Sequence, residues 1–262
     1  MAKFCALFSG SKANCTYISG SKGAVLVDAG ASAKAILNAI DEIGEDTQNI
    51  KAILVTHEHS DHIKGLKAIT KKLNVPVIAS SKTLDAITNI NAVDAGANLI
   101  PLDSGTLDSQ VGEIMRFETK HDCEGSSGYS IILPDQTKIS VCTDLGIVTS
   151  SVRDALKGSN IVLLESNHDI RMLQSGPYPP ELKLRIAGEY GHLSNSAAAS
   201  ELVDLLHSGT TRFILGHLSE NNNLPALAIR TSEAALMDAG AKKSEDYLLS
   251  CAVRENREII YF

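Results

Sequence analysis

A cluster of histidines directly after an apolar segment constrains this chain more than any other feature. Lys51–Val55 is followed at once by Thr56–His62, a run that holds His57, His59, Asp61 and His62. Because His57 and His59 alternate, an extended backbone would point both to the same side, while Asp61 and His62 follow where we expect the strand to turn into a loop. Imidazole suits zinc, iron and nickel, and a carboxylate also accepts manganese. The alternative is a polar surface loop that is rich in His; the spacing instead predicts a metal site.

Composition sets the class of protein around this site. The 262 residues are 44% hydrophobic, which suffices for one large core, so we expect a single domain over residues 1–262. A formal net charge of -7 argues against binding nucleic acid through net electrostatics, although a basic patch beside a metal site is compatible with it. The five Cys show no CxxC spacing, which favours buried thiols in a reducing cytosol over disulfides. We find neither a long apolar span nor a leader peptide, so we expect a cytoplasmic protein with no membrane partner.

The apolar pattern predicts strands and helices in two successive halves. Helices are expected at Ala31–Ile43, Lys64–Leu73, Ser81–Thr88, Ser150–Leu156, Ser194–His207 and Pro225–Ala239. Strands followed by helices, repeated in two halves, predict an α/β (α+β) protein: a four-layer αββα sandwich with two mixed sheets face to face and helices on both outer faces. Ligands at strand ends would then meet along one edge. The expected strands are Phe4–Phe8, Thr16–Ser19, Ala24–Asp28, Ala52–Val55, Val75–Ala79, Asn98–Leu102, Val111–Thr119, Gly128–Leu133, Lys138–Cys142, Asn160–Glu165, Arg212–Gly216 and Tyr247–Ser250.

Three further residues stand just after predicted strands. His121, Asp144 and His217 each follow an apolar run, where side chains reach the rim of a sheet. Taken singly, each is weak, since an Asp at a strand end is more often a turn residue. Together with the His loop, they indicate additional metal ligands.

In this order, His57-x-His59-x-Asp61-His62, His121, Asp144 and His217, with Asp28 closing an early strand, resemble the motifs of the metallo-β-lactamase-fold hydrolases. The resemblance spans nearly the whole chain. It implies the αββα sandwich and two divalent metal ions, which could be Zn, Mn or Fe. One ion would take His57, His59 and His121, the other Asp61, His62 and His217, and Asp144 would bridge them. Asp28 would lie beneath the site and orient the His loop.

Three later stretches narrow the branch of this family. Glu165-Ser166-Asn167, Gly191–Ala198 and Gly216–Asn222 resemble elements of tRNA 3′-processing and related phosphodiesterases. The whole order is most similar to the small bacterial YycJ (WalJ/VicX-like) group, which is described as DNA exonuclease-like. Its opening Ser-Gly-Ser-x-Gly-Asn appears here as Ser9–Asn14, with Ala13 in place of Gly. We therefore expect a minimal phosphodiesterase without an inserted second domain.

The expected chemistry is hydrolysis of a phosphodiester by a hydroxide that bridges two metals. His192 is our candidate proton donor to the leaving oxygen, held in orientation by Glu165, and Asp61 is an alternative proton carrier. The structural alternatives are that His192 only neighbours the start of a helix and that Glu165 caps a helix or pairs with a Lys. His168 is expected on the surface and His207 at a helix end, and neither is a predicted ligand.

The expected partner is a nucleic acid substrate, with DNA favoured. Two basic segments are candidates for phosphate contact: a helix face with Lys64, Lys67, Lys71 and Lys72, which we favour as a solvated face, and Leu182–Arg185. A small-molecule hydrolase acting on a thioester, lactone or cyclic phosphodiester stays open, and the scarcity of aromatic residues fits it somewhat better. A non-catalytic metal-bound regulator is a further alternative, against which Glu165 and His192 argue. A homodimer also stays open.

Overall fold

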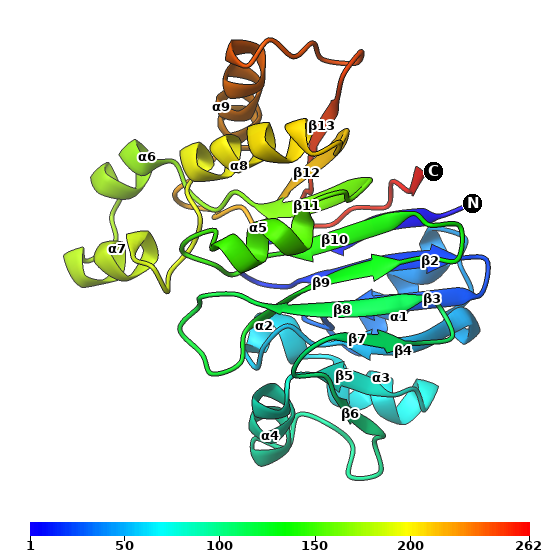
Figure 1. Ribbon diagram of the computed structural model, residues 1–262. Helices are drawn as coiled ribbons and strands as arrows, with labels where there is room; N and C mark the ends of the chain where they lie inside the picture. Colours follow the sequence, from blue (N-terminus) through cyan, green and yellow to red (C-terminus); the bar gives the residue numbers. More distant parts are fainter.

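Two seven-stranded sheets lie face to face in the computed structural model, which describes residues 1–262 (Figure 1). The first sheet has the order β14-β1-β2-β3-β4-β5-β6 and the second β13-β12-β11-β10-β9-β8-β7. Each is mixed: β3 to β6 are parallel in the first, and β10 to β13 in the second, whereas their other pairs are antiparallel. The strands are β1 (Lys3–Phe8), β2 (Cys15–Gly20), β3 (Gly23–Val27), β4 (Ile50–Leu54), β5 (Val77–Ala79), β6 (Leu99–Pro101), β7 (Thr106–Asp108), β8 (Glu113–Glu118), β9 (Ser127–Ile132), β10 (Lys138–Cys142), β11 (Ile161–Glu165), β12 (Arg212–Gly216), β13 (Leu248–Cys251) and β14 (Ile260–Tyr261).

The central core fills the space between the sheets. Val25 and Leu54 of the first sheet share it with Ile131 and Leu163 of the second, and all four are buried. Tyr129 on β9 also spans the gap, because its hydroxyl donates to the carbonyl of Val55 at 2.8 Å. Strands buried on both faces read as continuous apolar runs, which is why their positions could be predicted within a residue or two.

Helices cover the outer face of each sheet (Figure 1). On the first sheet, α1 and α3 bury Ile36, Ile40 and Ile69 in a second apolar cluster. On the second sheet, α5, α8 and α9 bury Val152, Leu202 and Leu236 in a third. Three cores separated by two sheets confirm the predicted αββα sandwich. The helices are α1 (Ala33–Glu42), α2 (Ser60–Ile63), α3 (Leu66–Leu73), α4 (Ser81–Asn89), α5 (Ser150–Leu156), α6 (Ile170–Ser175), α7 (Pro180–Ala187), α8 (Asn195–His207) and α9 (Pro225–Asp238), with a 3₁₀ turn at Thr47–Asn49.

The region after the His loop differs from the prediction. The expected helix over Lys64–Leu73 is preceded by a separate short helix, α2, and begins only at Leu66. Gly65 lies at the break, where a Cβ would come within 2.4 Å of the carbonyl oxygen of Ala31, so the chain can approach the β3–α1 connection this closely only with glycine. The expectation that Asp61 and His62 lie in a loop was wrong, since both stand on α2.

The sequence pattern also missed α6 and α7, which protrude beyond the edge of the sandwich (Figure 1). Helix α7 has no buried residue, so it shows no apolar periodicity to detect. The short edge strands β7 and β14 were missed as well. No helix is both long and apolar enough to cross a membrane.

Candidate metal centre

The backbone of the His loop is hydrogen-bonded to the connection between β1 and β2 and to the turn between β3 and α1. The backbone N–H of Asn14 donates to the carbonyl of Asp61 at 2.8 Å, and that of Ala29 donates to the carbonyl of His62 at 2.7 Å. Gly30 makes this contact feasible, because a Cβ there would lie 1.6 Å from the carbonyl oxygen of Asp61. The N-terminal strands therefore fix the position of Asp61 and His62 before any side chain is considered.

Asp28 lies directly beneath the loop and is buried. Its carboxylate accepts hydrogen bonds from the backbone N–H of Thr56 at 2.8 Å, from the Thr56 hydroxyl at 2.9 Å and from His62 Nδ1 at 2.7 Å. An Nδ1–H that donates to a carboxylate leaves Nε2 of the same ring free to act as an electron-pair donor. His62 Nε2 in turn lies 3.2 Å from Asp144.

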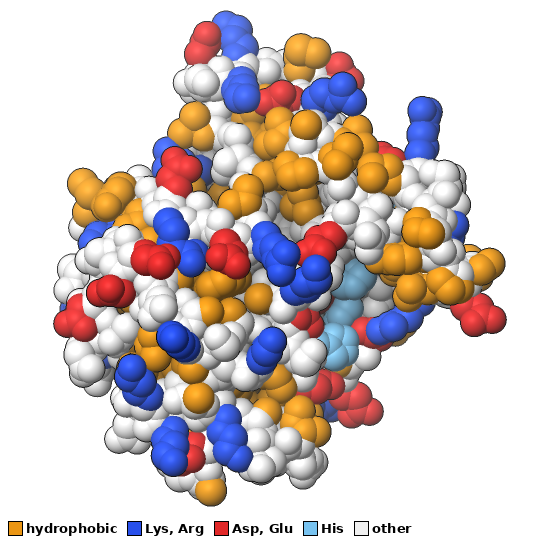
Figure 2. All heavy atoms as spheres, turned by 180° about the vertical axis from the view of Figure 1, so that it is seen from behind, with side chains coloured by type: hydrophobic (Ala, Val, Ile, Leu, Met, Phe, Trp, Pro, Cys, Tyr) orange, Lys and Arg blue, Asp and Glu red, His pale blue; other side chains and the backbone are white.

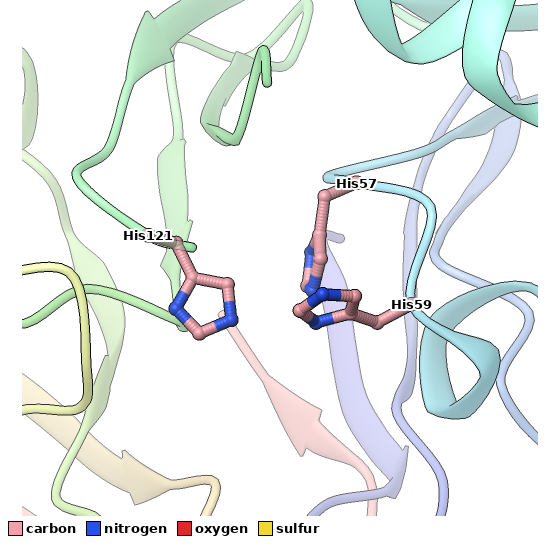
Figure 3. A group of neighbouring side chains, drawn as sticks. All are labelled: His57, His59 and His121. Atoms are coloured by element: carbon pink, nitrogen blue, oxygen red, sulfur yellow. The ribbon is translucent and has the colours of Figure 1, made fainter. Parts of the chain in front are cut away.

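Three histidines converge from the two sheets. His57 and His59 come from the loop after β4, and His121 comes from the segment between β8 and β9 on the opposite side (Figure 3). One nitrogen from each lies within 4.8 Å of the others. His57 Nε2 is buried and has no hydrogen-bond partner. Buried polar atoms are rarely left without a partner, and three convergent imidazoles are a typical donor set for a divalent transition metal.

Asp144 joins this group to a second one. Its Oδ2 lies 3.2 Å from His217 Nδ1, and its Oδ1 lies 3.7 Å from His121 Nε2. The metal-compatible groups around it are His57, His62 and Asp144, and Asp144, Glu165, His192 and His217. Asp61 lies at the edge of these groups, with its Oδ2 3.4 Å from His62 Nε2. All seven residues that the family resemblance implies as ligands thus lie in one continuous cluster.

The backbone adopts an unusual conformation at three of these strand ends. Asp28, Asp144 and His217 have φ values of 64°, 58° and 53°, in the left-handed region that residues other than glycine seldom occupy. Each follows a strand, β3, β10 or β12, within two residues. The left-handed turn redirects the side chain away from the sheet and into the shared cluster.

The pKa values of the cluster favour the protonation states that bind a cation. Burial lowers the pKa of His57 well below its usual value, and the neighbouring His62 adds to this effect. Burial alone would raise the pKa of Asp144, but His217 and His62 hold it well below its usual range. A neutral imidazole and an ionised carboxylate are the protonation states that metal ligands need.

Buried polar atoms without hydrogen-bond partners also indicate that the donor set binds a divalent metal. His217 Nδ1 and Asp144 Oδ2, like His57 Nε2, are buried and make no hydrogen bond. Burial alone would lower the pKa of His62, but the carboxylates of Asp144 and Asp28 raise it well above its usual value. A cation among these groups would take the place of that proton and provide a partner for the orphaned atoms.

Glu165 and His192 form a pair beside the cluster. His192 Nδ1 lies 2.8 Å from Glu165 Oε1, and the buried carboxylate also accepts from the backbone N–H of Leu145 at 2.9 Å and of Leu193 at 3.3 Å. Burial alone would lower the pKa of His192, but Glu165 raises it to about 9. The side chain of His192 is 23% exposed, so its ring can reach a bound molecule. The alternative in which Glu165 pairs with a Lys does not occur.

Two residues of the site escaped the sequence reasoning. Asp122 Oδ1 lies 3.1 Å from His121 Nε2, and its other oxygen accepts from Arg185 on α7. Asn14 Nδ2 lies 3.1 Å from Asp61 Oδ2 and 3.0 Å from His62 Nε2. Asn14 ends the Ser9–Asn14 motif, so its position in that motif was the available signal; Asp122 carried none beyond adjacency to His121.

Other predicted residues fall outside the cluster. We expected His168 on the surface, and this was wrong, because His168 is only 3% exposed. His207 ends α8 and is exposed, as expected. The side chains of Lys64, Lys67, Lys71 and Lys72 are all exposed.

Figure 2 shows the imidazoles at the bottom of a hollow, with charged side chains of both signs on its rim.

This fold and donor set define the class of protein. A family model described as the metallo-beta-lactamase superfamily matches residues 9–217. The chain belongs to the metallo-beta-lactamase superfamily.

Individual relatives narrow the match. The chain is 34% identical over 248 residues to exodeoxyribonuclease WalJ of Streptococcus pneumoniae, which covers 94% of this chain and 92% of that protein. It is 35% identical over 245 residues to exodeoxyribonuclease YycJ of Bacillus anthracis, with 90% of each covered. These similarities confirm the resemblance to the YycJ group. The crystal structure of the metallo-beta-lactamase fold protein YhfI from Bacillus subtilis superimposes over 99% of this chain and 98% of that chain, with a TM-score of 0.73 at 11% identity, and at that identity it shows the fold alone.

Proposed function

We propose that this protein is a metal-dependent exodeoxyribonuclease that hydrolyses phosphodiester bonds at the ends of DNA. The observation that carries the proposal is similarity over nearly the full length to two exodeoxyribonucleases, combined with a convergent His and Asp cluster at the edge of the sandwich. The central core draws strands from both halves of the chain, which supports one domain over residues 1–262.

We assign two divalent ions to the cluster, drawn from Zn, Mn and Fe. Bound there, they would supply Lewis acidity and an activated water for attack on phosphorus. Asp144 fits the bridging role because it contacts both groups of histidines. The proposed ligands are His57, His59 and His121 for one ion, Asp61, His62 and His217 for the other, and Asp144 for both.

The chain's own residues would manage the proton and the geometry. Glu165 raises the pKa of His192 to about 9, which favours a protonated ring at neutral pH, and the ring lies beside Asp144 with Nδ1 3.7 Å from Oδ1. It is therefore placed to give a proton to the leaving oxygen, while Glu165 holds the ring through Nδ1. Asp61, half-buried at the edge of the cluster, is the alternative proton carrier. Asp28 would orient the His loop through Thr56 and His62.

The test is digestion of end-labelled single- and double-stranded DNA and RNA by manganese-loaded protein. Asp144→Ala should abolish stepwise shortening of DNA, because it removes the residue that joins the two groups. Asp135→Ala, which removes an exposed carboxylate from the turn after β9, is the matched control and should digest as wild type. Digestion that survives in Asp144→Ala would refute the metal assignment. Absence of digestion with every metal tried, alongside turnover of a thioester, lactone or cyclic phosphodiester, would establish a small-molecule hydrolase instead.

A further inference from the structure

A cavity lies next to the metal cluster, beside the protruding helices α6 and α7. It has a volume of about 510 Å³, is partly open to solvent, and is lined by α6, α7, the start of α8 and the turn at Gly146. This is within the usual size range of pockets that bind small molecules. Figure 2 shows hydrophobic side chains gathered beside the imidazoles on the side where α6 and α7 lie. Its apolar wall consists of Ile170, Leu173, Pro180, Leu184, Ala187 and Ala197.

His192 separates this cavity from the metal cluster. The residue lines both the large cavity and a smaller one of about 180 Å³ that is also lined by His121 and Asp122. The ring of His192 is also stacked at 5.4 Å from that of His217. A group bound in the large cavity and a phosphate bound at the metal cluster would therefore lie on opposite sides of the His192 ring.

His168 gives the apolar cavity a polar edge. The residue is only 3% exposed and lines the cavity; its Nδ1 is buried away from the cavity, which leaves Nε2 as the ring nitrogen that can face a bound group. Its backbone is fixed, because its carbonyl accepts from the backbone N–H of Asn195 at 2.8 Å. An imidazole nitrogen at a rigid position on the edge of an apolar cavity can make a directed hydrogen bond to a bound group.

We propose that this cavity binds the nucleobase of the nucleotide that adjoins the scissile phosphate. The inference rests on the proposed function and names the part of the substrate that the site recognises. A base has two apolar faces and a hydrogen-bonding edge, which match the walls of Leu173 and Leu184 and the ring of His168. Lys183 is the only Lys or Arg on the lining, and its Nζ donates to the carbonyl of Gln174 at 2.7 Å, so the lining offers no free Lys or Arg to bind a phosphate. An acyl chain would leave the His168 imidazole unpaired.

Ala187→Trp tests the cavity by filling it. Ala187 is exposed on α7 and lines the cavity, so a larger side chain can enter without disturbing a core. Ala234→Trp, at an exposed position of α9, is the matched control. The substrates are DNA strands whose 5′- or 3′-terminal nucleotide either carries its base or is replaced by an abasic tetrahydrofuran residue.

Wild type should favour the base-bearing terminus in kcat/KM by about 5- to 150-fold at the end where it acts, the range expected from stacking of one base. Ala187→Trp should bring that ratio close to one, and Ala234→Trp should keep it. His168→Phe retains the ring without its nitrogens and should reduce discrimination between the four bases. Equal digestion of abasic and base-bearing termini by wild type, or an unchanged ratio in Ala187→Trp, would refute the proposal.

Binding of 2-aminopurine deoxynucleoside monophosphate, followed by its fluorescence, separates this inference from the proposed function. Binding by wild type and by Ala234→Trp, with loss in Ala187→Trp, supports the base site whether or not DNA is digested. DNA digestion without such binding refutes the base site and leaves the nuclease intact. Binding without digestion of any nucleic acid refutes the nuclease and leaves the base site.

Discussion

Asp28→Asn is the sharpest perturbation of the metal centre that does not touch a proposed ligand. The two side chains have nearly the same shape, so the amide oxygen of the variant can still accept from the Thr56 N–H, which lies 2.8 Å from Asp28 Oδ1. The change falls on Oδ2, which lies 2.7 Å from His62 Nδ1. An amide NH₂ at that position would face the N–H of His62 and favour the other tautomer of the ring. His62 Nε2 would then carry a proton and lose its capacity to bind a metal.

The size of the effect follows from these contacts. Loss of a partner that orients a metal-binding imidazole weakens metal affinity by about 10- to 100-fold, or about 1.4 to 2.8 kcal/mol. In the metal-free protein, burial opposes protonation of His62, but Asp144 and Asp28 raise its pKa above the usual value. The resulting stabilisation is complete below the unfolded-state pKa of about 6.5 and is lost as the pH rises through the higher folded-state value. Asp28→Asn should therefore lower stability most at acidic pH.

Two measurements check this reasoning. Titration calorimetry with Mn²⁺ and Zn²⁺, with a competing chelator where binding is tight, gives the affinity, and urea unfolding of chelator-treated protein at pH 5.5 and pH 8 gives the stability. Asp103→Asn is the matched control, because Asp103 likewise accepts from a backbone N–H and a hydroxyl, both of Ser81, but is far along the chain from the site. Wild-type metal affinity in Asp28→Asn, or an equal loss in Asp103→Asn, would show that Asp28 does not orient the loop.

Three further predictions come from other parts of the molecule. Glu165→Gln removes the carboxylate that raises the pKa of His192 to about 9. Because bound cations lower this pKa, we expect DNA digestion by wild type to reach its alkaline limit at or below about pH 9, and the variant to reach it at a lower pH. An unmoved limit in the pH–rate profile would exclude His192 as the proton donor. Tyr129→Phe removes a hydrogen bond between the two sheets and should cost about 0.5 to 1.5 kcal/mol in urea unfolding without changing metal affinity. Gly30→Ala places a Cβ 1.6 Å from a carbonyl oxygen of the His loop and should greatly reduce metal binding, whereas Gly96→Ala, with its nearest atom at 3.6 Å, should bind as wild type; equal binding by both would contradict the close approach.

Much of the fold could be predicted because its two kinds of layer leave different patterns. Strands such as β4 and β11 are buried on both faces and contain the apolar runs Ala52–Leu54 and Ile161–Leu164, while α1 has a clear apolar face. Helix α7 left no such pattern, since it packs no side chain into a core. Its contribution is to enclose a cavity, and a cavity wall has no sequence period.

The residues of the site likewise include some that the sequence could reveal and some that it could not. Asp144 and His217 could be found because each follows an apolar strand, and the family resemblance placed them in one set. Burial of His168 could not be found, because it depends on the pairing of its segment with Ser194 at the start of α8, which is distant in sequence. The contact of Asp122 with His121 likewise depends on Arg185, which holds the carboxylate from α7.

The left-handed backbone at Asp28, Asp144 and His217 leads us to expect that the stability of this protein depends on metal supply. Each such residue costs on the order of 1–3 kcal/mol, which is a large share of the free energy that keeps a domain folded. A bound cation offsets that cost in proportion to its free concentration, since it binds the folded chain in preference to the unfolded one. In a metal-starved cell the unfolded fraction rises, and proteases remove it. The abundance of the protein, and not only its activity, should then follow the availability of the ion.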